Sequence, residues 1–486
     1  MTVADGLFGH RGLNAYQEVR VEAGFGYGVM GADLHVFGDG SPVYLLRESG
    51  GRTASNVARD RDGLPAQPSH LLNARHAIVD FTGREDEVGE LTAWRDSGEG
   101  RAVRWLHAPG GQGKTRLADH VAASAARQGW RVIVAEHAAS LVVDAKDQTS
   151  HDLRLGAARG LLMLVDYADR WALAHLTWLL SNKVLDQDVP VRVLLLARNE
   201  HVWPALRHAL VQAGWPALSC TARSLGALPS DEDARADMFV AARDCFARCY
   251  GSPDASAIGV PGWLGRTEFG LTLAVHTAAL VAVDRHARRA PQPAGPPEDM
   301  PALTVYLLER KSHHWHALHG TADCLAGART AFGTPPERMR RAVFTAVLTG
   351  PLGHQDAKAV LDTVGVGGDA DRVLADHTFC YPPADPRTVL EPLYPDRLAE
   401  DFLALCLPGH DLPEQLPEAW AAGVPEALLS APGGGALAPY AARTITFLTA
   451  AAERWPHLNP TLEALERLLP EDPDDAPDDR KRLRAC

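Results

Sequence analysis

The segment HAPGGQGKTRLADH, residues 107–120, places three glycines, a lysine and a threonine directly before a helical pattern. It matches the P-loop pattern of a glycine, four residues and Gly-Lys-Thr, with Ala108 in place of the first glycine. Gly110, Gly111 and Gly113 allow consecutive backbone N–H groups to converge on phosphate oxygens, and the positive end of the following helix strengthens that attraction. The apolar run VRWLHA before the loop and the helical run KTRLADHVAASAA after it predict a strand, a phosphate-binding loop and a helix.

Two further strand ends complete the predicted nucleotide site. Asp166 follows five apolar residues in LLMLVDYAD, 52 positions after Lys114. It is expected to hold Mg²⁺ together with the Thr115 hydroxyl, while Lys114 reaches the β- and γ-phosphates. Arg198 ends the strand pattern VRVLLLARN and is expected to sense the γ-phosphate, because the carboxyl ends of parallel strands open onto the ligand crevice; an ordinary surface arginine is the alternative. The residues expected to contact the nucleotide from the loop are Ala108, Pro109, Gly110, Gly111, Gln112, Gly113, Lys114, Thr115 and Arg116.

The bulk composition restricts the class of protein. A chain of 486 residues, 46% apolar and 22% charged, is typical of a soluble globular protein with several domains. The net charge of −13 argues against a broad nucleic-acid-binding surface. Seven scattered cysteines favour a reducing cytoplasm over a disulfide framework. The start MTVADGLFGHRG lacks the features of a signal peptide, and the apolar run at 270–283 is too short for a membrane span, so we expect neither export nor a membrane partner.

The order of strand and helix patterns predicts the fold class. From residue 100 to about 200, short apolar runs alternate with helical stretches at 114–127 and 171–184, which predicts a parallel sheet covered by helices on both faces, an α/β P-loop NTPase fold. Helical periodicity dominates after about residue 225. Within 335–407, three helical patterns precede the proline-rich TFCYPPADPRTVLEPLYP, which is expected to form two short strands. Three helices and a hairpin describe a winged helix.

The N-terminal residues have a different pattern of apolar and polar side chains from the rest of the chain. Residues 15–48 alternate apolar and polar side chains and predict a small β module, and the polar residues 49–75 predict a linker. The predicted domains are a β-rich module and linker (1–75), a P-loop α/β domain (76–225), a helical lid (226–332), a winged helix (333–410), a C-terminal helical segment (411–470) and a disordered charged tail (471–486).

Together these motifs resemble those of the STAND class of P-loop NTPases, the signal-transduction ATPases that include the NACHT and plant-resistance-type switches. PGGQGKTRLA is similar to the phosphate loop of the class, LLMLVDYAD to its magnesium motif and VRVLLLAR to its sensor strand. FTGREDEVGEL at 81–91 is similar to the Gly-Arg-Glu segment that precedes the nucleotide domain, and implies that Arg84 lies near the nucleotide. The resemblance, to the bacterial members in particular, spans residues 78–410 and implies an ASCE-type sheet and binding of ATP or ADP with Mg²⁺.

The resemblance also implies a function. Members of the class are conformational switches that ADP holds closed and ATP releases, so we expect a regulatory ATPase with a protein partner or self-assembly on activation, in signalling, defence or transcriptional control. A ligand shifts such an equilibrium only by its difference in affinity for the two states.

The chain departs from the class at two positions. The helical domain usually carries a Gly-x-Pro motif near the adenine, whereas TEFGLTLAVH has Gly270 followed by Leu271 and no proline. A winged-helix histidine contacts the ADP β-phosphate in many members, and His377 in LADHTFCYP is the candidate here, with a loop histidine of structural role as the alternative.

Hydrolysis is expected to be slow. ASCE-type enzymes commonly carry a glutamate beside the magnesium aspartate to orient the attacking water, but here Tyr167 follows Asp166 and the next acid is Asp169. Without a well-placed base, the rate depends mainly on charge neutralisation by Lys114 and Mg²⁺. A P-loop phosphotransferase acting on a small molecule and a nucleotide-stabilised scaffold without turnover are the alternative functions.

Three other clusters have a functional and a structural interpretation. The histidines of KSHHWHALHG can bind a metal or form a solvated helix face. Cys245 and Cys249 can share a helix face as metal ligands or serve as small packing residues. The arginines of ERMRRAV at 337–343 can contact DNA through the winged helix, although winged helices of this class are mostly internal regulatory domains.

Overall fold

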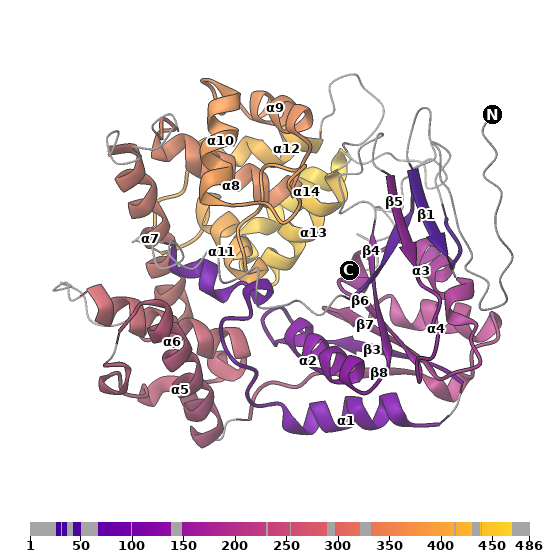
Figure 1. Cartoon of the computed structure of the whole chain (residues 1–486). Helices are drawn as coiled ribbons and strands as arrows, with labels where there is room; N and C mark the ends of the chain where they lie inside the picture. Colours follow the sequence, from indigo (N-terminus) through magenta and orange to yellow (C-terminus); the bar gives the residue numbers. More distant parts are fainter. Residues whose placement is uncertain are drawn as a thin grey trace, which may run out of the picture.

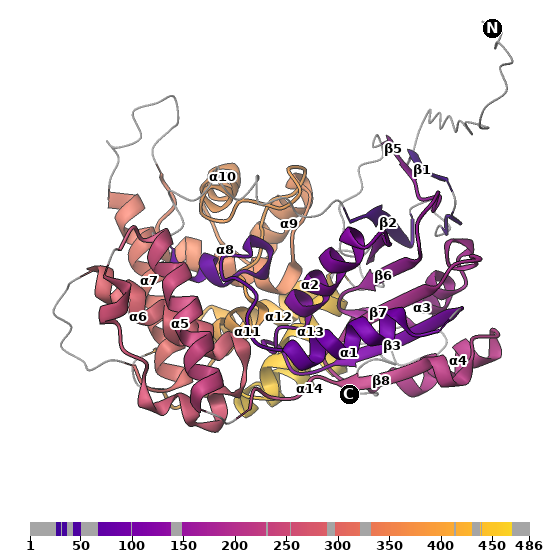
Figure 2. The ribbon, with the colours of Figure 1, turned by 60° about the horizontal axis from the view of Figure 1, so that its bottom comes forward.

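The computed structural model describes residues 26–30, 32–35, 42–49, 67–98, 100–137, 148–229, 232–252, 254–288, 297–320, 332–412, 415–429, 438 and 440–468. Within these ranges an α/β half and an all-helical half lie side by side (Figure 1). A second view shows the same division, with the sheet in the earlier part of the chain and the helices in the later part (Figure 2).

The α/β half is built on a six-stranded sheet with the order β2-β4-β6-β7-β3-β8. The strands are β2 (Tyr44–Glu48), β3 (Arg101–His107), β4 (Arg131–His137), β6 (Leu161–Val165), β7 (Val191–Ala197) and β8 (Cys220–Ser224). All but β2 run parallel to their neighbours. The strands predicted before the P-loop, at LLMLV and at VRVLLLA are confirmed. One strand lies between the P-loop strand β3 and the acidic strand β6, which fits the predicted ASCE-type P-loop fold.

Helices cover both faces of this sheet. The helices α1 (Glu85–Asp96) and α2 (Lys114–Arg127) pack on one face, and α3 (Leu173–Leu180) and α4 (Trp203–Gln212) pack on the other. Successive residues of β6 alternate between the two cores, with Leu162 and Leu164 facing α2 and Met163 facing α3. Because both faces are buried, the strands read as continuous apolar runs. The helix predicted at 171–184 is shorter, since η7 (Lys183–Leu185) replaces its last turn.

The strands near the N-terminus join the α/β half instead of forming a separate module. Strand β1 (Gly26–Met30) pairs in parallel with β5 (Gln148–Asp152), and β2 pairs antiparallel with β4. An edge strand such as β4 offers unpaired N–H and C=O groups, and β2 satisfies them. Tyr44 and Leu46 are buried in the same core as Trp105 of the P-loop strand. The two described strands of the predicted module therefore have their partners elsewhere in the chain.

Part of the predicted linker is also structured. Residues 67–76 form the 3-10 helices η3 (Pro68–Leu72) and η4 (Ala74–His76). Leu71 and Leu72 are buried where η3 packs against α6 (Thr272–Arg288) and α7 (Met300–Gly320). Because residues 49–75 are mostly polar, the sequence pattern did not predict that these two leucines are buried. The segment thus connects the two halves and, as described below, lines the cavity between them.

The helical half shares one continuous hydrophobic core. Besides α6 and α7 it contains α5 (Glu232–Cys249), α8 (Pro336–Thr349), α9 (His354–Thr363), α10 (Ala370–Cys380), α11 (Asp396–Cys406), α12 (Val424–Leu429), α13 (Ala441–Ala452) and α14 (Asn459–Arg467). Helix α11 packs against α13 and α8. The three helical units predicted from the sequence therefore pack as one body within the described residues. Among those residues no helix combines the length and apolar character needed to cross a membrane.

The region predicted as a winged helix has its three helices, α8, α9 and α10, but not its hairpin. Helix α10 continues to Cys380, through residues that were expected to begin a strand. After it, Leu352 and Val389 form an isolated antiparallel bridge in place of two paired strands. Pro382, Pro383 and Pro386 lack the N–H group that a strand ladder requires, which limits pairing here to one bridge. The winged-helix assignment stays a prediction.

Candidate functional site

The P-loop has the backbone geometry of a phosphate cradle. Gly111 and Gly113 adopt φ values of 90° and 87°, in the left-handed region that glycine tolerates, and α2 begins directly after them at Lys114. The Lys114 Nζ donates hydrogen bonds to the carbonyl oxygens of Ala108, at 2.6 Å, and Pro109, at 3.2 Å. The lysine therefore lies folded over the loop, at the N-terminal end of a helix that attracts anions.

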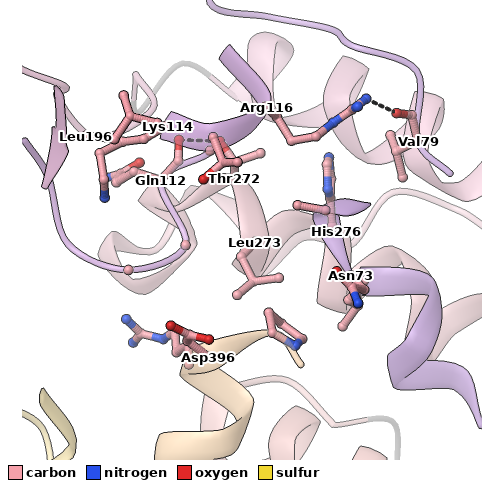
Figure 3. A pocket seen from close by; sticks show the side chains of 18 of the residues that line it. Asn73, Val79, Gln112, Lys114, Arg116, Leu196, Thr272, Leu273, His276 and Asp396 are labelled. Atoms are coloured by element: carbon pink, nitrogen blue, oxygen red, sulfur yellow. Dashed lines mark hydrogen bonds between the residues drawn. The ribbon is translucent and has the colours of Figure 1, made fainter. Parts of the chain in front are cut away.

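A cavity of about 200 Å³ opens at this loop, between the two halves of the molecule. Its walls come from the P-loop, from the ends of β6 and β7, from the segment 71–84, from the start of α6 and from the start of α11. In Figure 3, Gln112, Thr272 and Leu273 lie on the side opposite Asp396, and His276 and Asn73 lie farther along the cavity. Of the predicted residues, the cavity contains Gly110, Gly111, Gln112, Gly113, Lys114, Thr115, Arg116, Arg84, Asp166, Asp169 and Arg198.

Thr115 and Asp166 are in direct contact. The Thr115 hydroxyl donates to Asp166 Oδ2 at 3.0 Å, and the backbone N–H of Tyr167 donates to Asp166 Oδ1 at 2.9 Å. Burial raises the pKa of Asp166, and the two hydrogen bonds partly offset it. Asp169 also lines the cavity, and its buried Oδ1 has no hydrogen-bond partner within the described part of the chain. A hydroxyl and carboxylates are the hard oxygen donors that Mg²⁺ prefers, so this donor set fits the ion.

Two arginines hold the loop and its surroundings in place. The Arg84 guanidinium donates to Gln112 Oε1 and to the Gly226 carbonyl, both at 2.8 Å, so it links the P-loop to the segment that follows β8. Arg116 donates to the Val79 carbonyl at 2.8 Å and fixes the segment that closes the far end of the cavity. Arg84 thus lies beside the site, as the sequence predicted, but its hydrogen bonds go to the protein.

The helical half contacts the P-loop through the start of α6. The Leu273 N–H donates to the Gly111 carbonyl at 2.9 Å, and the Thr272 hydroxyl donates to the Gln112 carbonyl at 3.3 Å. These contacts follow directly after Gly270 and Leu271, the segment in which the expected Gly-x-Pro motif is missing. Thr272, Leu273 and His276 could not be predicted as cavity residues from the sequence, because none of them belongs to a motif.

Arg198 lies at the tip of the P-loop and is held by carboxylates of α11. Its guanidinium carbon lies 3.8 Å from the position that a Cβ on Gly110 would take. The guanidinium forms ion pairs with Glu400, whose side chain is fully buried, and with Asp396 at 3.4 Å. Burial lowers the pKa of Arg198, but Glu400 and Asp396 outweigh it and raise the pKa overall. The alternative of an ordinary surface arginine is excluded by these contacts.

Asp396 is shared between Arg198 and a second arginine. Arg170 donates to Asp396 Oδ2 at 3.0 Å. Burial raises the pKa of Asp396, yet Arg170, Arg198 and Arg443 together lower it to about 2. The carboxylate is therefore ionised at neutral pH and joins the α/β half to α11. Asp396 and Glu400 could not be predicted from the sequence, because they lie 198 or more positions from Arg198 and outside every recognised motif.

His377 does not contact the cavity, contrary to expectation. It is fully buried within the helical half, where its ring stacks on Tyr381 with 4.8 Å between centroids. Burial lowers the pKa of His377 to about 3, and Lys311 nearby contributes, so the ring is neutral. Helix α10 turns Val373, His377 and Cys380 toward the core, one helical turn apart. The histidine is therefore a core residue, and the alternative interpretation of a structural role is the one that fits.

The same core contains a buried lysine, Lys311. Lys311 is 1% exposed, and burial lowers its pKa to about 7 from an ordinary value of 10.5. The unfolded chain binds a proton between these two pH values and the folded protein does not, so the penalty is full below pH 7 and is relieved as the pH rises towards 10.5. We expect Lys311→Met to raise the free energy of unfolding by roughly 2 to 4 kcal/mol at pH 7.

Urea unfolding of wild type and Lys311→Met at pH 7 and pH 9.5 measures this effect. The difference between the two proteins should be large at pH 7 and should shrink at pH 9.5. A difference of equal size at both pH values would show that packing, and not the buried charge, sets the stability of this site. Comparing two proteins at each pH removes the contribution of other groups that titrate in this range.

The remaining clusters from the sequence are engaged in structural contacts or spread over the surface. His313, His316 and His319 are exposed along α7. Among the described residues no group of three or more His, Cys, Asp or Glu side chains is arranged to hold a metal ion. Cys245 contacts Asp80 and Arg248. Of the arginines proposed for DNA, Arg340 pairs with Glu418 and Arg341 stacks on Trp420. These two arginines are therefore used within the chain.

Comparison with known proteins adds little to this picture. No protein-family model and no curated protein sequence matches the chain. Among solved structures, it is similar to the Aeropyrum pernix ORC1 protein in complex with DNA, with 14% identity, a TM-score of 0.31 and coverage of 69% of this chain and 96% of that one. It is also similar to the ADPNP–ADP complexes of the Aeropyrum pernix ORC2 protein, with 16% identity, a TM-score of 0.29 and coverage of 66% and 93%. With TM-scores this low, the P-loop nucleotide-binding fold rests on the chain's own strand order and loop geometry.

Proposed function

We propose that this chain is an ATP- and ADP-binding regulatory ATPase of the STAND type, which uses the nucleotide and Mg²⁺ to switch between a closed and an open arrangement of its two halves. One observation carries the proposal: α11 of the helical half lies in the same cavity as the P-loop, and its Asp396 and Glu400 pair with Arg198 at the loop tip. A nucleotide in this cavity therefore touches both halves at once.

Competition for Arg198 supplies the difference between ADP and ATP. The γ-phosphate is the group that the strand-end arginine is expected to sense, and a guanidinium forms strong hydrogen bonds with phosphate as well as with carboxylate. When the Arg198 guanidinium binds the γ-phosphate, Asp396 and Glu400 lose an ion-pair partner. Helix α11 is then held less tightly against the α/β half. ADP lacks that phosphate and leaves the ion pairs in place. The two nucleotides thus have different affinities for the closed and open arrangements, which is the requirement for a switch.

Within this proposal the residues have separate roles. Lys114 and the loop N–H groups bind the β- and γ-phosphates, Thr115 and Asp166 hold Mg²⁺, and Asp169 is the candidate for orienting the attacking water. Bound Mg²⁺ neutralises charge on the phosphate oxygens. Tyr167 occupies the position after Asp166 in a left-handed conformation, with φ of 53°, and provides no carboxylate there. Hydrolysis is therefore expected to be slow, which suits a switch that must persist in its ATP form.

The position of α11 beside the P-loop separates this proposal from the phosphotransferase alternative. A phosphotransferase needs space for a second substrate beside the terminal phosphate, whereas here α11 and its ion pairs occupy that side of the P-loop. A nucleotide-stabilised scaffold would have the same closed form and would differ only in its response to ATP.

The proposal is tested by purifying the full chain, identifying the nucleotide that copurifies, and measuring the molar mass by light scattering with ADP and with ATP. We expect tightly held ADP, a compact particle with ADP, and a larger assembly or a more extended particle with ATP. Rapid turnover by a monomer would favour a phosphotransferase or another conventional enzyme. An identical particle with both nucleotides and no turnover would favour the scaffold.

A further inference from the structure

Arg397, the second residue of α11, lies over the tip of the P-loop. Its side chain lines the cavity, and its Cδ lies 3.7 Å from the position that a Cβ on Gly111 would take. Gly111 has φ of 90°, so the loop turns at this point and brings its backbone close to α11. Arg198 approaches the neighbouring Gly110 in the same way. Two arginine side chains, one from each half of the molecule, therefore reach adjacent residues of the phosphate loop.

The arginines beside Arg397 have carboxylate partners, and Arg397 has none. Arg198 pairs with Glu400 and Asp396, Arg170 with Asp396, and Arg454 with Glu400 and Asp401. Within the described part of the chain, the Arg397 guanidinium forms no ion pair, and its buried Nε has no hydrogen-bond partner. The carboxylates of α11 thus form their ion pairs with other arginines, and Arg397 lines the cavity without an ion-pair partner among the described residues.

A partly buried cation without an ion pair is unfavourable unless an anion binds it. Burial lowers the pKa of Arg397 and Arg454 nearby lowers it further, whereas Asp401 and Glu400 offset only part of this effect, so the surroundings disfavour its charge without a ligand. A guanidinium binds phosphate oxygens in a planar, bidentate geometry, which satisfies both its charge and its hydrogen-bond donors. The cavity at Arg397 is the one that contains Lys114 and the phosphate loop, so the anion that fits is the phosphate chain of a nucleotide.

We propose that Arg397 binds the phosphate chain of the bound nucleotide from the helical half, so that docking of α11 and binding of the phosphates are one event. The proposal rests on the nucleotide binding proposed above and adds a ligand that no sequence motif marks. In the proposed switch, Arg198 loses its ion pairs with Asp396 and Glu400 when it binds the γ-phosphate, whereas Arg397 has no ion pair to break. Its contact is therefore available to the phosphates of ADP as well as ATP, and it favours the closed arrangement.

The test measures the affinity of the full chain for ADP and for a non-hydrolysable ATP analogue by isothermal titration calorimetry. We expect Arg397→Ala to weaken ADP binding by about tenfold or more, because a charge-assisted contact is lost. Arg397→Lys should retain part of the affinity. Arg467→Ala should leave both affinities unchanged, because Arg467 is an exposed arginine on α14 whose partner among the described residues is the Glu463 carbonyl.

Thermal unfolding distinguishes a ligand contact from a structural role. Because burial disfavours the charge of Arg397 without nucleotide, Arg397→Ala should melt at a temperature no lower than wild type in nucleotide-free buffer, and only the stabilisation by ADP should decrease. An unchanged ADP affinity, or a melting temperature that falls equally with and without ADP, would overturn the proposal. Failure of the proposed switch would give a different result from failure of the Arg397 contact. Wild type would then bind ADP but show the same particle mass with ADP and with ATP, independently of the effect of Arg397→Ala.

Discussion

Replacing Lys114 by alanine is expected to weaken binding of both ADP and ATP by about a hundredfold or more. Lys114 lies folded over the loop at the start of α2, where its ammonium reaches the carbonyls of Ala108 and Pro109. Burial and the neighbouring Arg198 guanidinium lower its pKa to about 8, so its charge is disfavoured until an anion binds. A bound phosphate chain offsets the burial of the Lys114 charge and accepts a charge-assisted hydrogen bond from it. The alanine variant lacks both of these favourable contributions to binding. Titration of nucleotide-free protein with each nucleotide gives the affinities.

Lys358→Ala is the matched control, because Lys358 is another helix lysine whose partner, Asp371, is exposed and distant from the cavity. It should bind nucleotide like wild type. Lys114→Ala should also lose the ATP-dependent change in particle mass while keeping its fold, since no carboxylate within the described residues pairs with Lys114. If Lys114→Ala bound ADP as tightly as wild type, the phosphate site would have to lie elsewhere.

The local parts of this site could be predicted from the sequence. The P-loop, Asp166 and Arg198 each stand at the end of an apolar strand pattern, and parallel strands bring their carboxyl ends to one edge of the sheet. Neighbours in sequence determine such features: the loop glycines set the backbone, and α2 starts where they end. The direct contact between Thr115 and Asp166 follows from the same topology, although 51 positions separate the two residues.

The part contributed by the helical half could not be predicted in this way. Asp396, Arg397 and Glu400 meet the P-loop only because α11 docks on the α/β half, and that docking depends on packing between distant helices. His377 illustrates the difficulty, since the family resemblance made it the candidate for a phosphate contact and the packing of α10 buries it instead. The polar residues 49–75 predicted a linker, because the two leucines at its end, Leu71 and Leu72, give no periodic signal. The resemblance to a family drew attention to Gly270 and Leu271, next to the contact made by α6, but to no residue of α11.

Asp396→Asn is expected to shift the switch toward its open arrangement by about a hundredfold. Asp396 carries the ion pairs from α11 to Arg170 and Arg198, and its carboxylate is 12% exposed, so removing its charge leaves two poorly solvated arginines with one partner fewer. Breaking such a pair costs roughly 3 kcal/mol, and here the cost falls on the closed arrangement alone. Light scattering should therefore show the ATP-dependent change in particle mass at a much lower ATP concentration than in wild type.

Asp401→Asn provides the matched control, because it lies on the same helix and removes the same charge but pairs with Arg454 and Trp455, both in the helical half. It should lower the thermal stability of the helical half without changing the ATP concentration at which the particle responds. If the two variants shifted the response equally, general weakening of α11 would explain both. If only Asp396→Asn shifts it, the ion pairs that cross between the halves set the energy difference between closed and open forms. In that case Asp396→Asn and the γ-phosphate weaken the same ion pair, the variant by removing the charge of Asp396 and the γ-phosphate by binding its partner Arg198.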